Sequence, residues 1–222
     1  HARIGKLIAT LNGLKDEAKV SGRVRTIINL FYERRAWDDA LMMVDRIKDP
    51  LGAAWLRYEV CEYCARNGAK GDWWERCVKA LDEILGLKPD ERGTLRAKYA
   101  LARISRDRVG NPQRALKIIL DIADPPTSLW ELVTTYRVLG EKRKADSALE
   151  EIASMFPDQA PRAVWTLARF AEEDGDRKKA VALYRRLLSQ PEWKKSGESS
   201  QAHQALERLG ERTGGALTDK VR

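Results

Sequence analysis

The chain has 222 residues, of which 43% are hydrophobic and 33% are charged, a balance typical of a folded protein rather than a disordered one. The 41 Lys and Arg residues outnumber the 33 Asp and Glu residues and give a net charge of +8, which permits contact with nucleic acid, an anionic membrane or an acidic protein without requiring any of them. No run approaches the roughly 18 consecutive apolar residues that a bilayer-spanning helix needs.

Helical signals follow one another along the chain, whereas alternating strand patterns and hairpin turns are nearly absent. Residues 2–19 predict a leading helix, and about five helix pairs are expected between about 22 and 192. Residues 199–212 predict a capping helix with a solvated outer face, and 213–222 predict a flexible tail. The sequence therefore predicts an all-α fold.

Two helix starts can be predicted from their capping residues. Asn111 and Pro112 have the side chains expected of an N-cap and of the first helical position. Ser128 and Glu131 have the spacing of a capping box, in which each side chain accepts a hydrogen bond from the backbone N–H of the other residue.

The helix pairs repeat. Trp130 and Trp165 are 35 residues apart, and so are the members of three further pairs in the same stretches: Leu132 and Leu167, Gly140 and Gly175, Ala145 and Ala180. A period near 34 with a glycine turn, followed five residues later by alanine, resembles the tetratricopeptide repeat (TPR). The resemblance covers roughly residues 22–192, clearly in the last two pairs and loosely in three earlier ones, where Arg35 stands in the place of one turn glycine.

The TPR resemblance implies a single domain over residues 2–212, built as a right-handed α-solenoid of antiparallel helix pairs. In such a stack each pair buries its apolar face only on its neighbours and leaves an extended surface for a partner. The resemblance therefore implies a non-catalytic protein-interaction scaffold.

The stretch "CEYCARNGAKGDWWERC" places Cys61, Cys64 and Cys77 close together and allows two interpretations. A metal or redox centre is one, but the pair lies in the middle of a predicted helix, and the only histidines are His1 and His203. The other is packing, because the repeat alignment puts these cysteines where the last pair has alanine, and cysteine is small and often buried. The sequence favours core cysteines and no metal site.

Enzyme motifs are lacking, since the chain has no glycine-rich phosphate loop, no G-x-S-x-G and no H-E-x-x-H. We therefore expect no catalytic residue and no cofactor. Three cysteines are too few for a disulfide framework and favour a reducing compartment such as the cytoplasm. Because the given sequence begins with His1 and not with methionine, removal of an upstream segment is an alternative, and with it an exported or periplasmic location.

Aromatic residues recur at one position of the first helix in four of the five pairs, and Arg25 takes this position in the first pair. In the TPR family these helices line a concave groove, so the resemblance implies that this position contacts a protein or peptide partner. The alternative is that the rings are core between repeats. The predicted groove residues are Arg25, Asn29, Tyr58, Tyr99, Trp130, Thr134, Arg137, Arg162, Trp165 and Arg169.

Basic residues recur where the second helices begin. One interpretation is solvated charge at a turn; the other is an electrostatic strip that docks nucleic acid, an anionic membrane or an acidic partner. A third possible activity is self-assembly into a homo-oligomer. The predicted basic edge consists of Arg114, Arg143, Lys144, Lys178 and Lys179.

Overall fold

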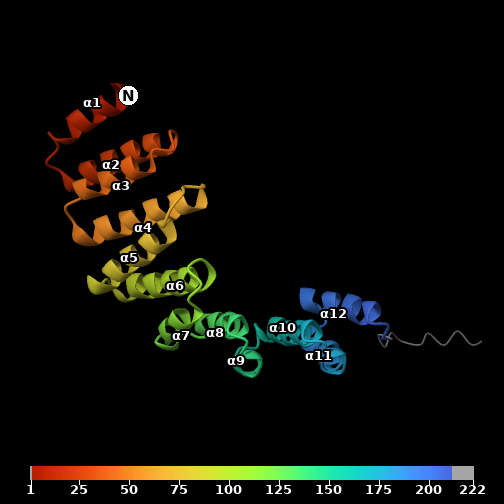
Figure 1. Ribbon diagram of the computed structural model, residues 1–222. Helices are drawn as coiled ribbons and strands as arrows, with labels where there is room; N and C mark the ends of the chain where they lie inside the picture. Colours follow the sequence, from red (N-terminus) through yellow and green to blue (C-terminus); the bar gives the residue numbers. More distant parts are fainter. Residues whose placement is uncertain (1, 212–222) are drawn as a thin grey trace, which may run out of the picture. The chain divides into compact units, whose positions relative to one another are not determined.

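The computed structural model describes residues 2–211, which form helices and no strand (Figure 1). The all-α prediction is confirmed. His1, the last residue of the predicted capping helix and the predicted tail at 213–222 lie outside the described residues.

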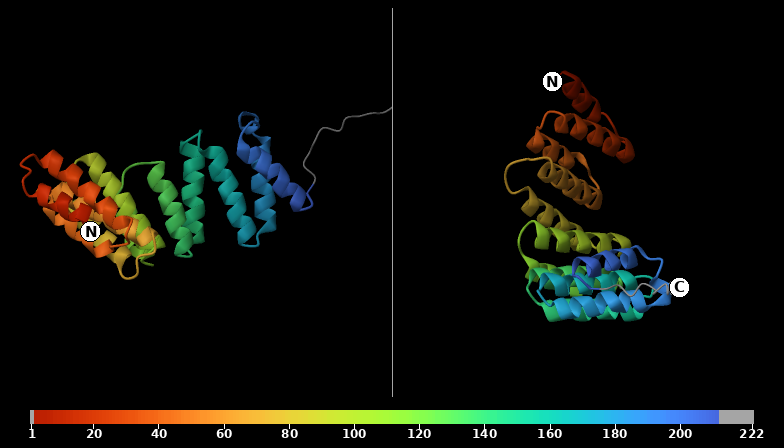
Figure 2. Two further views of the ribbon diagram at one scale, coloured as in Figure 1. Left: turned by 90° about the horizontal axis from the view of Figure 1, so that it is seen from above. Right: turned by 90° about the vertical axis from the view of Figure 1, so that its right-hand side faces the viewer.

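The chain forms two compact units, His1–Ile122 and Ala123–Arg222, called unit 1 and unit 2 below. Unit 1 contains α1 (Ala2–Leu11), α2 (Glu17–Tyr32), α3 (Trp37–Met42) with the short 3-10 helix η1 (Met43–Arg46), α4 (Pro50–Arg66), α5 (Trp73–Gly86), α6 (Glu91–Asp107) and α7 (Pro112–Leu120). Here α2 pairs with α3, α4 with α5 and α6 with α7, and α1 packs on α2 (Figure 2).

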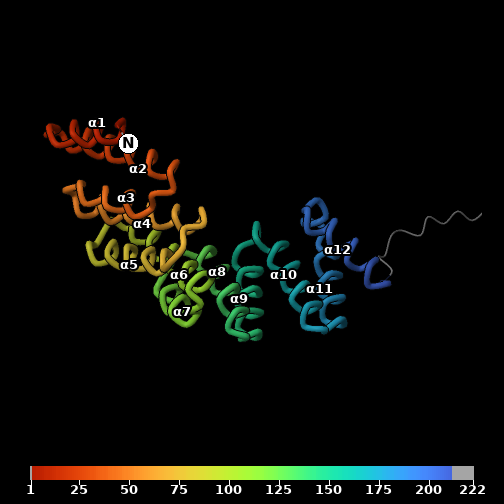
Figure 3. Tube along the Cα trace, turned by 45° about the horizontal axis from the view of Figure 1, so that its top comes forward, coloured from red at the N-terminus to blue at the C-terminus, as the bar shows by residue number. Residues whose placement is uncertain are grey.

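Unit 2 contains α8 (Thr127–Val138), α9 (Lys142–Met155), α10 (Ala160–Glu173), α11 (Arg177–Ser189), the 3-10 helix η2 (Pro191–Trp193) and α12 (Gly197–Arg208). Here α8 pairs with α9, α10 with α11, and α12 packs on both α10 and α11 (Figure 3). The predicted consecutive pairing of helices is therefore present in both units.

One of the two predicted caps is correct. The Asn111 side chain accepts a hydrogen bond from the Arg114 N–H at 3.0 Å, and Pro112 is the first residue of α7. Ser128 is not a cap, because α8 already begins at Thr127 and Ser128 is a buried helical residue. The Ser128 N–H donates to the Asp124 carbonyl at 3.0 Å, so helical bonding starts upstream of the predicted capping box.

The small residue early in each second helix is fully buried. All five positions have 0% exposure: Ala40, Cys77, Ala115, Ala145 and Ala180. A side chain with at most one heavy atom beyond Cβ lets the backbones of two helices approach closely, and the closely packed interior leaves no room for more. The repeat therefore appears in the structure as a repeated spacer between crossing helices.

The turn that precedes the second helix also repeats. Gly110, Gly140 and Gly175 each lie two residues before a second helix and have φ values of 70°, 75° and 81°. Arg35 lies two residues before α3 and has a φ of 55°. Arg35 therefore adopts the left-handed conformation that glycine adopts in the other turns, and a Cβ makes this conformation costly.

We expect Arg35→Gly to stabilise unit 1 by about 1 kcal/mol, because glycine removes the steric cost of the left-handed conformation. Gly110→Ala is the matched opposite change, since a Cβ at Gly110 would meet no atom within 4 Å and only its φ opposes the substitution. Urea unfolding should show a higher midpoint for Arg35→Gly and a lower one for Gly110→Ala. Equal midpoints for Arg35→Gly and the unchanged chain would contradict the assigned strain.

Candidate binding groove

The three cysteines are part of the core of unit 1. Cys61 and Cys64 lie on α4 and Cys77 on α5, and their exposed fractions are 1%, 0% and 0%. Burial raises the pKa of the Cys61 thiol to about 11 and that of Cys64 to about 12, and it raises the pKa of Cys77 still further. Within residues 2–211 no group of three or more His, Cys, Asp or Glu side chains is arranged to hold a metal ion. The three cysteines are therefore core residues, as the packing interpretation predicts.

All three thiols should therefore resist thiol–disulfide exchange in the folded protein, because the thiolate is the reactive form and burial disfavours it. We expect native-state reaction with a chromogenic disulfide reagent to be at least about a hundredfold slower than reaction of the urea-unfolded chain. Ala182→Cys, at an exposed position of α11, is the positive control and should add one fast-reacting thiol. A fast thiol in the unchanged folded chain would contradict the burial of these cysteines.

The predicted aromatic column divides between core and surface. Tyr58 is 7% exposed and belongs to the core of unit 1, so its prediction as a groove residue is wrong and the core alternative holds for it. Tyr99 is half-buried, with the Arg103 guanidinium 5.9 Å from its ring centroid. Trp130 and Trp165 are half-buried and pack partly against the core of unit 2. Of these rings, only the half-buried ones present a face to solvent.

Two of the predicted groove residues of unit 1 line a small pocket between α2 and α4. Arg25 and Asn29 form part of its wall, together with the stacked rings of Tyr32 and Tyr63, whose centroids are 3.9 Å apart. Arg25 Nη1 donates to Glu59 Oε2 at 2.7 Å, so its charge is neutralised within the pocket. The pocket has a volume of about 250 Å³, which is small for a ligand site.

A larger groove lies in unit 2 between α10, α11 and α12, and is called the unit 2 groove below. Its volume is about 610 Å³, within the range of ligand-binding clefts. Trp165 forms one wall, and the Arg169 guanidinium lies 5.1 Å from its ring centroid. The lining residues are Trp165, Arg169, Glu172 and Glu173 of α10, Tyr184 of α11, and Gln201, Gln204, Ala205 and Arg208 of α12.

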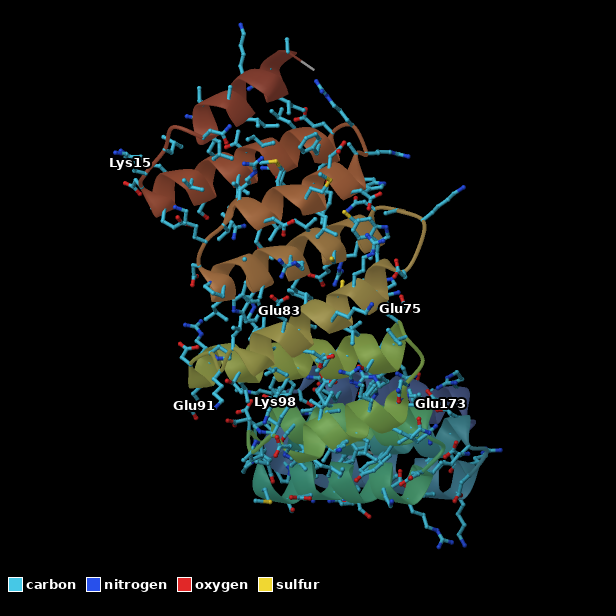
Figure 4. The ribbon with its side chains drawn as sticks, turned by 60° about the vertical axis from the view of Figure 1, so that its left-hand side comes forward. Lys15, Glu75, Glu83, Glu91, Lys98 and Glu173 are labelled. Carbon is cyan, nitrogen blue, oxygen red and sulfur yellow. The ribbon has the colours of Figure 1, made fainter. Side chains whose placement is uncertain are left out.

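The charges of the unit 2 groove are paired with one another. Arg208 donates to both carboxylate oxygens of Glu172 at 2.6 and 3.1 Å, and the Tyr184 hydroxyl donates to Glu172 Oε2 at 3.1 Å. Burial, and then the bond to Glu172, raise the pKa of Tyr184 to about 12. Arg169 donates to Glu173, which projects from α10, at 2.6 Å (Figure 4). The groove therefore offers two balanced ion pairs rather than an excess of one sign.

The other predicted residues of α8 and α10 lie beside Trp130. The Arg162 guanidinium covers the Trp130 ring at 4.5 Å from its centroid, and the Thr134 hydroxyl donates to the Trp130 carbonyl at 3.1 Å. Neither Thr134 nor Arg162 lines the unit 2 groove. Trp130 Nε1 is buried and has no hydrogen-bond partner among the described residues.

Arg137 joins α8 to the end of α10. Its side chain is 18% exposed and donates to both Asp174 oxygens at 2.9 and 3.2 Å. Its guanidinium also lies 4.2 Å from the Phe170 ring centroid. Arg137 is therefore a structural bracket between α8 and the end of α10, and its contact with a partner stays a prediction.

The basic edge is largely neutralised in the structure. Arg114 pairs with Asp82 at 2.6 Å, Lys179 with Asp146 at 2.6 Å, and Lys144 with Glu141 at 2.5 Å. Within the described part of the chain, Arg143 and Lys178 take part in no ion pair. Exposed ion pairs of this kind are weak, so they leave docking through the basic edge as a prediction. Elsewhere in unit 1, exposed charges are paired in the same way, as Glu83 is with Arg57 and Lys98 with Asp121 (Figure 4).

Gln201, Gln204 and Arg208 were missed because residues 199–212 were predicted to be only a solvating cap. A signal was available in the glycine spacing, since Gly210 lies 35 residues after Gly175 and has a similar φ of 71°. That spacing marks α12 as a repeat of the first helix α10, and a first helix contributes to the groove surface.

No family model matches the chain, and no curated protein matches it. None of the helices between residues 2 and 211 has the length and apolar character required to cross a membrane.

Proposed function

We propose that the chain is a non-catalytic, TPR-like interaction protein whose unit 2 groove binds a peptide or an extended segment of a partner protein. The observation that carries the proposal is the groove itself, a cleft of about 610 Å³ with an indole wall and amide side chains. We further propose that the helix pairs of each unit follow the right-handed winding of TPR-like solenoids.

The residues of the groove suit an extended peptide. Gln201 and Gln204 lie three residues apart on α12, so both carboxamides are on one face of the helix. Each carboxamide can donate to a peptide carbonyl and accept from a peptide N–H, as a neighbouring strand would. Trp165 adds a rigid apolar surface for one ligand side chain, and a Trp with an adjacent Arg is a common binding hot spot.

The charge balance of the groove favours a ligand without a high net charge. Arg169 and Arg208 already pair with Glu173 and Glu172, and a charged ligand would have to displace an existing partner. We therefore expect affinity to depend on apolar contact and backbone hydrogen bonds, with only modest salt dependence.

A random peptide library displayed on phage tests the proposal with the full chain as bait. The unchanged protein should enrich a defined set of peptides, and the double variant Gln201→Ala/Gln204→Ala should bind them at least about tenfold more weakly. Both glutamines are exposed, so this variant should fold normally. Trp165→Ala should abolish binding.

Trp193→Ala is the matched control for loss of an indole. Trp193 is likewise half-buried against the unit 2 core but does not line the groove, so its variant should bind as the unchanged protein does. The proposal fails if the library yields no specific peptide, or if the double glutamine variant and Trp165→Ala bind the selected peptides as well as Trp193→Ala does.

A further inference from the structure

Along each unit, ion pairs link one second helix to the next. In every such pair the acid lies on the earlier helix and the base on the later one. In unit 1, Asp38 of α3 pairs with Arg76 of α5 at 3.2 Å, and Asp82 of α5 pairs with Arg114 of α7 at 2.6 Å. The same order, acid on the earlier helix and base on the later one, continues in unit 2. In each of these pairs a carboxylate of the earlier second helix thus faces a base of the next one.

In unit 2 the linked helices are α9 and α11. Asp146 of α9 pairs with Lys179 of α11 at 2.6 Å, and Glu150 of α9 pairs with Arg186 of α11 at 2.9 Å. Lys179 and Arg186 are seven residues apart, so they lie on one stripe of α11 that faces α9.

The series does not continue on the opposite side of α11. The sequence of α11, "RKKAVALYRRLLS", contains no acidic residue and so offers no carboxylate to a following helix; the same holds for α7, "PQRALKIIL". Arg177, Lys178 and Arg185 surround Val181 and Ala182 at a shallow recess of about 550 Å³, called the α11 end face below. Lys178 and Arg185 are seven residues apart with the two apolar residues between them, the spacing that a helix laid along α11 would meet.

A carboxylate of the chain already occupies one part of this face. Glu211 pairs with Arg185 at 2.8 Å and with Arg177 at 3.5 Å. Arg177 also donates to the Leu209 carbonyl. The three cations exceed this single acid, and Lys178 takes part in no ion pair within the described residues. The α11 end face therefore retains a net positive charge around an apolar floor.

We propose that the α11 end face docks an acidic amphipathic helix of a partner protein. Charge complementarity selects this occupant over a second copy of the chain. A copy that extended the series would present α1, whose exposed residues include Arg3 and Lys6, to a face that is already basic. The residues after Glu211 include Arg212, Lys220 and Arg222 against Asp219, so they do not supply the acidic partner either.

The test uses the full chain and a synthetic helical peptide of about 16 residues, with alanine and leucine on one face and glutamates along its borders. Fluorescence anisotropy at about 50 mM salt should show saturable binding, and about 300 mM salt should weaken it at least about fivefold. The same peptide with lysine in place of every glutamate should not bind. Lys178→Glu/Arg185→Glu should weaken binding of the glutamate peptide at least about tenfold.

Lys194→Glu/Lys195→Glu is the matched control, because it changes the net charge equally at two exposed residues outside the face and should lower affinity less than about threefold. Circular dichroism establishes that each variant is folded. The proposal is overturned if the two double variants bind the glutamate peptide equally, or if no saturable binding occurs.

Two further outcomes also overturn it. One is concentration-dependent self-association, seen by light scattering, that Lys178→Glu/Arg185→Glu abolishes, since the occupant would then be a second copy. The other is a single-stranded oligonucleotide that binds more tightly than the glutamate peptide with the same dependence on Lys178 and Arg185. The face is separate from the unit 2 groove, so Gln201→Ala/Gln204→Ala should leave peptide docking here unchanged.

Discussion

Replacing Ala180 by leucine should destabilise unit 2 by about 3 kcal/mol, because the fully buried Cβ leaves no space for three further carbon atoms. Ala180 lies in the first turn of α11, which packs against α10 along its length. The larger side chain would have to adopt a strained rotamer or push the two helices apart, and close-packed interiors resist both. Urea unfolding followed by tryptophan fluorescence measures the loss.

The control exploits the cysteine at the equivalent place in unit 1. Ala180→Cys and Cys77→Ala exchange the two small residues between repeats and should each change the free energy of unfolding by less than about 1 kcal/mol. Cys77→Leu should cost as much as Ala180→Leu, since both positions are 0% exposed. If leucine were tolerated as well as cysteine at either site, these side chains would not be spacers.

This part of the fold was predictable because its cause is local and repeated. A helix crossing needs the same small side chain in every pair, so Ala145 and Ala180 could be recognised from a constant spacing, and Cys77 by alignment with them. The turn before each second helix repeats for the same reason. At Arg35 the sequence alone showed a missing glycine, whereas only the structure shows that the arginine adopts the φ of the glycines it replaces.

The candidate site was less predictable because its properties depend on partners far along the chain. Arg137 and Glu172 look like exposed helix charges in the sequence, yet their partners Asp174 and Arg208 lie 37 and 36 residues further on. Whether a charge is available to a ligand depends on such pairings, which no pattern within one helix reveals. The same holds for Lys179, whose partner is on the preceding second helix.

The second-largest loss of stability should follow removal of the Arg137 side chain. Arg137→Ala should lower the free energy of unfolding by about 2 kcal/mol. The partly exposed bidentate pair with Asp174 contributes about 1 kcal/mol after screening by solvent, and the contact with Phe170 adds about 0.5–1 kcal/mol. Arg137→Lys should recover only part of the loss, because lysine cannot form the fork or stack its plane on the ring. An equal stability of Arg137→Ala and the unchanged protein would show that the bracket contributes nothing.

The pair with Asp174 should also give unit 2 a distinctive acid response. Hydrogen bonds from Arg137 and then from Lys142 hold the pKa of the Asp174 carboxyl below its ordinary value of 3.8. A carboxyl whose folded pKa is depressed stabilises the fold above its unfolded pKa, and this contribution is lost as the pH falls through the folded value. Asp174→Asn should therefore lower the free energy of unfolding by about 1 kcal/mol between about pH 5 and 7, and the difference should shrink below about pH 4.

Asp158→Asn, which removes an exposed carboxylate, is the control and should show no such difference at neutral pH. A gap between Asp174→Asn and the unchanged protein that stayed constant down to about pH 2.5 would mean that the carboxylate is not stabilised by these two cations.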